Sequence, residues 1–377
     1  VVISGVGLWT PQHVITNEEL VASYNAYADK YNEENAADIE AGTLTAKPHS
    51  SAEFIEKASG IKQRYIYCKE GALDVNRMRP DIAERGDDEL SQQAEIALEA
   101  AKKALAAANK SPEDIDAVIV SCAYTQRSYP AIAIEVQNQL GIKGFGFDML
   151  VACSAATFGM HRAWEMVASG NARAVLVINP ELVSPQVNYT DRDSHFIFGD
   201  VATASIVEEL DTPKGYEILN SKLFTQFSTN IKNEYGFMDR SEYLAAETEM
   251  YPDLKAPVTD KLFLQNGRKV FREVCPKVSE IITEHLTENE LSADDVKMMW
   301  LHQANANMLD LILRTVVGRD ADKAIVPSVI DEFANTSSAS PMIVFHRYKD
   351  QLQSGDLGVI CSFGAGYSIG SVLVRKV

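Results

Sequence analysis

Cysteine and tryptophan are scarce in this chain of 377 residues, which contains five of the first and three of the second. The cysteines are scattered, odd in number and free of any CxxC pair, so they indicate neither a disulfide framework nor a thiolate metal site. A reducing, cytoplasmic location is the simplest expectation. No apolar run is long enough to span a bilayer, and the first residues lack the pattern of a signal peptide.

Positive charge is also in short supply, since 35 lysines and arginines stand against 53 aspartates and glutamates. The net charge of -18 argues against nucleic acid or an anionic membrane as a partner of the molecule as a whole. An acidic partner would need a local basic patch. The hydrophobic fraction of 46% is enough for a large core, and more than one domain is expected at this length.

The order of the elements indicates an α/β protein made of two similar halves. An acidic turn leads into an apolar strand at 111–122 and again at 292–301. A Ser-Gly turn precedes another apolar strand at 169–178 and again at 354–363. Two matches in the same order favour duplication over chance similarity of short units. We therefore predict largely parallel sheets that helices cover on both faces.

The first half is expected to cover residues 1–212 and the second half residues 213–377. Three polar stretches with little periodicity are expected to be insertions or surface loops, at 24–51, 69–88 and 230–261. The third could form a lid.

A long helix is expected at 267–286, where apolar residues recur at helical spacing. Pro276 lies within this stretch. Because proline removes a backbone donor and clashes with the preceding turn, it predicts a kink or a division into two short helices.

Cys153 stands at a corner of small residues between an apolar strand and a helix that ends at Gly170. A thiol at a helix N-terminus feels the positive end of the dipole and nearby free N–H groups. Both favour the thiolate, which is the nucleophilic form. Most buried cysteines are inert packing residues, so the partners found elsewhere in the chain decide between the two interpretations.

His302 and Asn335 are the candidate partners. His302 follows an apolar strand, and the carboxyl end of a strand is where α/β proteins place active sites. Taken alone, His302 could be a structural histidine and Asn335 a helix cap. Gly364 and Gly366 follow a later strand and would let backbone N–H groups approach a ligand. Their loop lacks the Gly-Lys-Ser/Thr ending of a phosphate-binding loop, so nucleotide binding is poorly supported.

These motifs occur in the order seen in β-ketoacyl-acyl-carrier-protein synthase III enzymes, and the chain resembles that family over nearly its whole length. The motifs that carry the resemblance are Ser59-Gly60-Ile61-Lys62-Gln63-Arg64, Cys153, Tyr189-Thr190-Asp191-Arg192, Phe198-Gly199-Asp200, His302-Gln303-Ala304-Asn305, Asn335-Thr336-Ser337 and Phe363-Gly364-Ala365-Gly366. Each is weak alone, but the ordered set is specific. The resemblance implies the thiolase fold, with two duplicated halves in a five-layered αβαβα sandwich, and a homodimer.

By this resemblance Cys153, His302 and Asn335 form a catalytic triad. Cys153 would be acylated by an acyl-CoA starter, because a thiolate opens a thioester best. The oxyanion would bind the backbone N–H groups of Cys153 and Ala365. Malonyl-acyl-carrier protein would lose CO2, and His302 and Asn335 would stabilise the enolate that attacks the acyl-cysteine. The implied reaction is the decarboxylative Claisen condensation that initiates fatty acid biosynthesis, without a metal or a cofactor.

The resemblance also assigns residues to coenzyme A. Phe54 stands where the family often stacks a tryptophan on the adenine, and Ala58 replaces a nearby arginine. The other positions implied to bind substrate or coenzyme A are Arg64, Arg192, Gly267, Phe271 and Asn305.

Two further assignments concern protein partners. Arg268, Lys269 and Arg272 form a basic patch suited to docking an acidic carrier protein, or else an ordinary solvated helix face. Asn307 replaces an arginine often found near that surface in the family. Tyr129 matches a loop that, in the family, reaches across the dimer and closes the acyl pocket of the partner.

Three other functions stay open. A degradative thiolase would need a second cysteine as acid and base, and Cys361 is the nearest candidate. The insertions and Ala58 are compatible with a synthase III-like enzyme for medium or long acyl chains or for secondary metabolites. A catalytically silent scaffold that binds carrier protein is a third hypothesis, which the intact triad disfavours.

Overall fold

The computed structural model describes residues 1–209, 214–234, 262–318 and 322–377. Its centre is a nine-stranded sheet in the order β11-β12-β13-β8-β1-β7-β6-β4-β5. In chain order these strands are β1 (Val2–Trp9), β4 (Ala117–Cys122), β5 (Phe145–Leu150), β6 (Ala174–Glu181), β7 (Val201–Glu208), β8 (Tyr216–Ser228), β11 (Val296–Leu301), β12 (Leu357–Gly364) and β13 (Gly366–Lys376). Only two residue pairs join β1 to β8, so the sheet has two arms that meet there.

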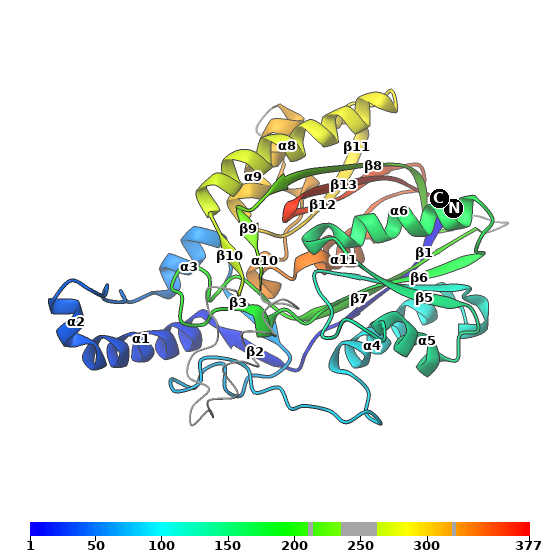
Figure 1. Cartoon of the computed structure of the whole chain (residues 1–377). Coiled ribbons are helices and arrows are strands. Elements are labelled where there is room, and N and C mark those ends of the chain that lie inside the picture. The colour runs from blue at the N-terminus through cyan, green and yellow to red at the C-terminus, as the bar shows by residue number, and fades with distance from the viewer. Residues whose placement is uncertain (210–213, 235–261, 319–321) are drawn as a thin grey trace.

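Helices form three layers around the two arms, as Figure 1 shows. Between the arms lie α6 (Ala155–Ala168) and α11 (Ser340–Tyr348). The outer face of β8 and β11 to β13 is covered by α8 (Gly267–Glu288) and α9 (Ala306–Val317). The outer face of the other arm is covered by α4 (Gln92–Ala108) and α5 (Ile132–Leu140). The result is the expected five-layered αβαβα sandwich.

The middle layer is apolar on both sides because it packs against both arms. Met160 and Val167 on α6, and Phe345 on α11, belong to one buried cluster with the inner faces of the strands. Trp300 of β11 meets Phe345 edge to face, with ring centroids 4.8 Å apart. The strands β4, β6 and β7 are buried along their whole length, which explains why their sequences are rich in alanine, valine and isoleucine.

The expectation of largely parallel strands is wrong. Only β4–β5, β4–β6 and β11–β12 pair in parallel, while the other five neighbouring pairs are antiparallel. A tight turn at Ala365 joins β12 directly to β13, and such a connection requires an antiparallel pair.

The division into two short helices, one of the two effects expected of Pro276, is absent, since α8 is one helix with Pro276 inside it. Val274 and Val278 on either side of the proline are buried, whereas Pro276 itself is exposed. A continuous buried face outweighs the loss of one helical hydrogen bond.

The two halves begin their parallel strands in the same way. A 3-10 turn with a reciprocal serine–aspartate cap precedes β4, at Ser111 and Asp114, and another precedes β11, at Ser292 and Asp295. The predicted boundary between 212 and 213 lies outside the described residues, and duplication of the halves stays a prediction.

Small elements cover the edge where the parallel strands end. They are β2 (His13–Thr16), α1 (Asn17–Glu34), α2 (Ala36–Glu40), α3 (Ala52–Ser59), β3 (Gln63–Ile66), β9 (Ile231–Lys232), β10 (Leu264–Gln265) and α10 (Ile330–Phe333). The stretch 24–51 is thus partly helical, 69–88 has no helix or strand, and most of 230–261 lies outside the described residues. Within the described ranges, no helix has both the length and the apolar character to cross a membrane.

Candidate active site

Cys153 lies at the corner between β5 and α6, as the sequence predicts. A single 3-10 turn, Ala152–Ser154, links the strand to the helix, and Ala152 has a positive φ of 46°. Gly364, at the end of β12, packs directly against this turn. A Cβ built on Gly364 would lie 2.7 Å from the Cβ and 2.9 Å from the backbone nitrogen of Cys153. Only glycine therefore allows the two segments to approach this closely.

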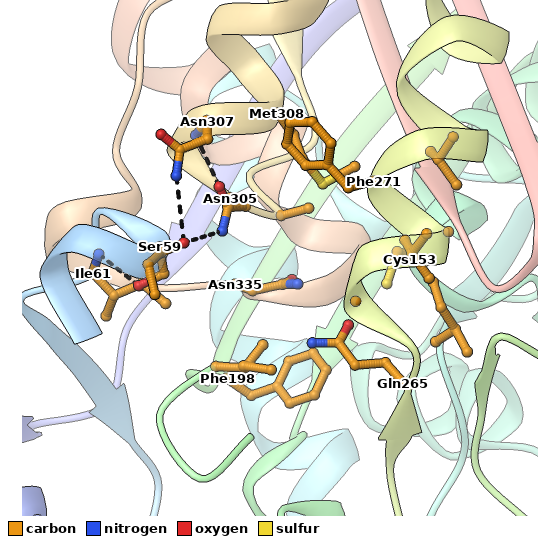
Figure 2. Close-up of a pocket in the computed structure, with 18 of the residues that line it drawn as sticks. Ser59, Ile61, Cys153, Phe198, Gln265, Phe271, Asn305, Asn307, Met308 and Asn335 are labelled. Atoms are coloured by element: carbon orange, nitrogen blue, oxygen red, sulfur yellow. Dashed lines mark hydrogen bonds between the residues drawn. The ribbon is translucent and has the colours of Figure 1, made fainter. Parts of the chain in front are cut away.

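The three predicted catalytic residues line one cavity of about 930 Å³, shown in Figure 2. Cys153 comes from one half of the chain, whereas His302 and Asn335 come from the other, where His302 directly follows β11. Gly364 also lines the cavity. The convergence that the sequence motifs predict is therefore present in the fold.

Asn335 is fixed through its backbone and its side chain. Its N–H donates to the carbonyl of Ile197 at 3.0 Å, and its carbonyl accepts from the N–H of Gly199 at 3.1 Å. Its side-chain Oδ1 accepts from the N–H of Ser337 at 2.8 Å. The amide nitrogen is thus left to face the cavity, as Figure 2 shows. The carboxamide presents donors, rather than an acceptor, to a bound substrate.

His302 is held by the hydroxyl of Ser340. The ring Nδ1 lies 2.6 Å from Ser340 Oγ, which also accepts from the N–H of Gln303 at 3.0 Å and lies 3.0 Å from the carbonyl of Ser337. Burial lowers the pKa of His302 to about 3, although the Ser337 backbone opposes this, so the ring is neutral.

The single hydroxyl proton of Ser340 sets the tautomer of that neutral ring. If the proton goes to the carbonyl of Ser337, Nδ1 of His302 is the donor and Nε2 is free to accept the proton of Cys153. If it goes to Nδ1, Nε2 carries hydrogen and can donate to an enolate oxygen. One serine therefore permits both neutral tautomers of the imidazole.

The electrostatics of Cys153 differ from the expectation. Burial raises the pKa of the thiol to about 12, a hydrogen bond from Ser337 lowers it, and the charge of Glu181 raises it. Glu181 is fully buried and accepts hydrogen bonds from the N–H groups of Ala123 and Ser338, and burial raises its own pKa to about 7. Burial therefore acts against the thiolate that a helix N-terminus favours.

The structure brings most of the predicted binding residues to the same cavity. Phe54, Gly267, Phe271 and Asn305 line it, together with Arg268 and Arg272. The guanidinium of Arg192 stacks on the ring of Phe54, 3.9 Å from its centroid, and Nε donates to the carbonyl of His49 at 2.8 Å. The side-chain nitrogen of Asn305 is already engaged, because it donates to the carbonyl of Ala58 at 2.7 Å. Lys269 is exposed on α8, the helix that also contains Arg268 and Arg272.

Arg64 does not reach the cavity, contrary to the prediction that it binds substrate. Its side chain is 3% exposed and donates to the carbonyls of Ile15 and Phe196 and to Oδ1 of Asn17. It therefore ties β2, α1 and the segment around Phe196 together. These three acceptors satisfy the two terminal nitrogens of the guanidinium, whereas its buried Nε has no hydrogen-bond partner among the described residues.

The remaining predicted positions lie outside the cavity lining. Ala365 occupies the turn between β12 and β13 and lines a neighbouring cavity of about 480 Å³ with Ala152. Tyr129 lies on the surface with 83% of its area exposed. Cys361, the second cysteine that a thiolase would use, is fully buried within β12.

Sequence reasoning missed several residues of the site. Ser337 and Ser340 bond to the triad residues, Glu181 holds the neighbouring Ser338, and Phe198, Gln265 and Met308 line the cavity. Ser337 lies within a quoted motif, and its position two residues after Asn335 was a usable signal. In the described part of the chain, no group of three or more histidine, cysteine, aspartate or glutamate side chains could hold a metal ion.

Comparison with known proteins agrees with this geometry. Residues 147–226 match the family described as 3-oxoacyl-acyl-carrier-protein synthase III, and residues 286–376 match its C-terminal domain. A β-ketodecanoyl-acyl-carrier-protein synthase from Pseudomonas aeruginosa is 50% identical over 94% of this chain and 99% of its own length. The chain belongs to the β-ketoacyl-acyl-carrier-protein synthase III family. It is therefore a condensing acyltransferase of fatty acid biosynthesis.

Other members of the family agree over the whole chain. A β-ketoacyl-acyl-carrier-protein synthase III from Ehrlichia canis is 32% identical over 99% of this chain and 98% of its own length. The crystal structure of a 3-oxoacyl-acyl-carrier-protein synthase III from Aquifex aeolicus superposes with a TM-score of 0.75 at 25% identity, covering 100% of this chain and 99% of that one. Both cover the two halves, so the fold and the family assignment apply to the whole chain.

Proposed function

We propose that this synthase transfers an acyl group from acyl-CoA to Cys153 and then condenses it with malonyl-acyl-carrier protein. The observation that carries the proposal is the convergence of Cys153, His302 and Asn335 on one cavity. His302 would take the thiol proton during acylation. The amide of Asn335 and the imidazole would then stabilise the enolate formed when malonyl thioester loses CO2. The product is a β-ketoacyl-acyl-carrier protein, two carbons longer than the starter.

We propose a medium-chain starter of about eight carbons. The relative from Pseudomonas aeruginosa with 50% identity is named for a β-ketodecanoyl product. A ten-carbon product minus the two carbons that decarboxylated malonyl supplies leaves an octanoyl starter. The cavities of about 930 and 480 Å³ that flank the turn at Ala152 and Cys153 support a site with room for such a chain. The reaction class does not depend on this chain length.

We propose a homodimer built on the edge strand β5. This strand ends the sheet among the described strands, and an apolar sheet edge is prone to pair with another chain. Phe145 is 47% exposed, Leu150 56% and Tyr129 83%, so large apolar side chains concentrate near this edge. The cavity beside Ala365 also contains Leu150, and a loop from a second copy could close it.

We also propose that α8 docks the carrier protein. Arg268, Lys269 and Arg272 are exposed on this helix, and the two arginines lie at the cavity that contains Cys153. On a chain with net charge -18, a local basic patch at the substrate entrance suits an acidic partner.

We propose a cytoplasmic setting for the reaction. The five cysteines support it, since all of them are free.

The test is to measure the mass of the intact protein after incubation with acyl-CoA thioesters of two to sixteen carbons. We expect one acyl increment on the Cys153 peptide, fastest with octanoyl-CoA, and its loss only when malonyl-acyl-carrier protein is added. A Cys153→Ala variant is the control and should gain no increment. No increment with any donor would contradict the synthase reaction. Loss of the increment to acetyl-CoA instead would indicate a thiolase, and a maximum at acetyl-CoA would refute only the chain length.

A further inference from the structure

Ser337 bonds to the catalytic machinery through three different atoms. Its Oγ donates to Sγ of Cys153 at 3.5 Å. Its N–H donates to Oδ1 of Asn335 at 2.8 Å. Its carbonyl accepts from Oγ of Ser340, which in turn holds the ring of His302. The residue is 1% exposed, so these bonds form in a dry environment where each is strong.

The local backbone directs the hydroxyl toward the sulfur. Ser337 has a φ of 49°, in the left-handed region that non-glycine residues seldom adopt, and it begins the short 3-10 turn Ser337–Ala339. The bond to Asn335 on one side and the bond to Ser340 on the other hold this conformation. Strained positions of this kind persist only when the surrounding structure determines them.

Acylation requires that the negative charge developing on the sulfur of Cys153 be stabilised, and the other two residues of the triad do not provide this. Because His302 is neutral in its buried site, it offers a proton acceptor but no positive charge to Cys153. The buried carboxyl of Glu181 opposes a negative sulfur. A hydrogen bond donated to a developing anion is stronger than one donated to a neutral atom. The Ser337 hydroxyl already donates to the sulfur of Cys153 and can therefore provide this stronger bond.

We propose that Ser337 is a further catalytic residue, whose hydroxyl stabilises the Cys153 thiolate during acylation. The thiol proton moves to Nε2 of His302 as the sulfur attacks the thioester carbon. The bond from that carbon to the sulfur of coenzyme A then breaks, and the same proton leaves with coenzyme A as its thiol. Ser337 keeps its own proton throughout. In the acylated protein the sulfur of Cys153 carries no charge, so the hydroxyl does not assist the loss of CO2 from malonyl thioester. When the enolate attacks the acyl carbon, the bond from that carbon to Cys153 breaks and the sulfur leaves as an anion, which the hydroxyl stabilises again.

The inference rests on the proposed function, but its main test needs no acyl substrate. The rate at which iodoacetamide alkylates the Cys153 peptide is measured against pH for the wild-type protein and for Ser337→Ala. We expect the midpoint of the pH profile to rise by about one unit, with alkylation roughly tenfold slower at a fixed pH below it. If no thioester acylates the protein, the proposed synthase reaction is wrong, but the alkylation profile still tests the role of Ser337.

Two other variants separate the hydroxyl from the backbone. Ser337→Gly also removes the hydroxyl but relaxes the strained φ, so the same shift in both variants assigns the effect to the hydroxyl. Thr336→Val is the matched control, because it removes a neighbouring buried hydroxyl that has no hydrogen-bond partner among the described residues. We expect Thr336→Val to keep the wild-type profile. An unchanged profile in Ser337→Ala and Ser337→Gly, or an equal shift in Thr336→Val, would overturn the proposal.

A second readout distinguishes a catalytic role from a structural one. Ser337→Ala retains the N–H that orients Asn335 and the carbonyl that accepts from Ser340. We therefore expect acylation by acyl-CoA to slow roughly tenfold. Loss of CO2 from malonyl thioester puts no charge on the sulfur, so its rate in a Cys153→Ala background should stay within about twofold when Ser337 is also changed to alanine. Equal losses in acylation and in CO2 release would show that the residue serves only to hold the loop.

Discussion

Replacing Gly364 with alanine tests the packing of β12 against the nucleophile. The added Cβ would lie 2.7 Å from the Cβ of Cys153, about 1 Å short of an ordinary carbon–carbon contact. The other close atoms are the backbone N and Cα of Cys153, at 2.9 and 3.2 Å, so no flexible side chain can move aside. One of the two backbones must therefore shift by a large fraction of an ångström.

That shift has two measurable consequences. Overpacking of this kind should lower the free energy of unfolding by about 1–3 kcal/mol, measured by urea denaturation. Moving the sulfur by about 1 Å relative to His302 and Asn335 should slow acylation roughly 100-fold, measured as the single-turnover gain of acyl mass on Cys153.

Gly141→Ala provides the control for stability alone. Gly141 ends α5 with a φ of 75°, and a Cβ there would meet nothing within 4 Å. The variant should lose about 1 kcal/mol through backbone strain and acylate at the wild-type rate. If Gly364→Ala is destabilised yet acylates as fast as this control, the contact does not position the nucleophile and the reasoning is refuted.

Four other predictions concern the triad, the histidines, the docking patch and the dimer. Asn335→Ala should slow condensation by roughly two decades while sparing self-acylation, measured on pre-acylated protein; equal losses would contradict a role at the enolate. The pKa of His195 falls from 6.5 to about 4 through burial, so the unfolded chain binds its proton first and stability falls below pH 6.5. Between pH 7.5 and 5 the wild type should lose about 2 kcal/mol that His195→Phe retains in urea denaturation; parallel losses would count against this. Arg268→Glu with Arg272→Glu should raise KM for malonyl-acyl-carrier protein roughly tenfold but hardly change the rate with a malonyl-pantetheine thioester; an equal effect on both would exclude docking. Phe145→Lys should convert the proposed dimer to a monomer in sedimentation, and an unchanged dimer would place the interface elsewhere.

Local patterns were reliable wherever a short stretch decides its own structure. Ser51 and Gly60 bracket α3 as cap residues, and Thr16 forms the reciprocal cap with Glu19 at the start of α1. The strand 117–122 matches β4 along its full length. These features depend on hydrogen bonds and side chains within a few residues, so the sequence contains the information directly.

Contacts between distant segments decided the features that the sequence reasoning predicted wrongly. Arg64 belongs to a motif of the family, yet its two terminal nitrogens meet acceptors from three other segments, and Arg64 is not among the residues that line the cavity. A division of the helix at Pro276 was one expectation, but a buried face continues past the proline in a single helix. Strand direction likewise depends on which strands become neighbours, and local hydrophobicity does not specify that.

By itself, the sequence determined the α/β class and the positions of several strands, and it predicted Cys153, His302 and Asn335 as the reacting residues. The tertiary structure alone decided that burial raises the pKa of the Cys153 thiol and that Ser337 links all three residues. Protonation and hydrogen-bond partnership depend on the water removed and the atoms brought close when segments 184 residues apart pack together. Neither quantity is a property of a residue type or of its neighbours in the chain.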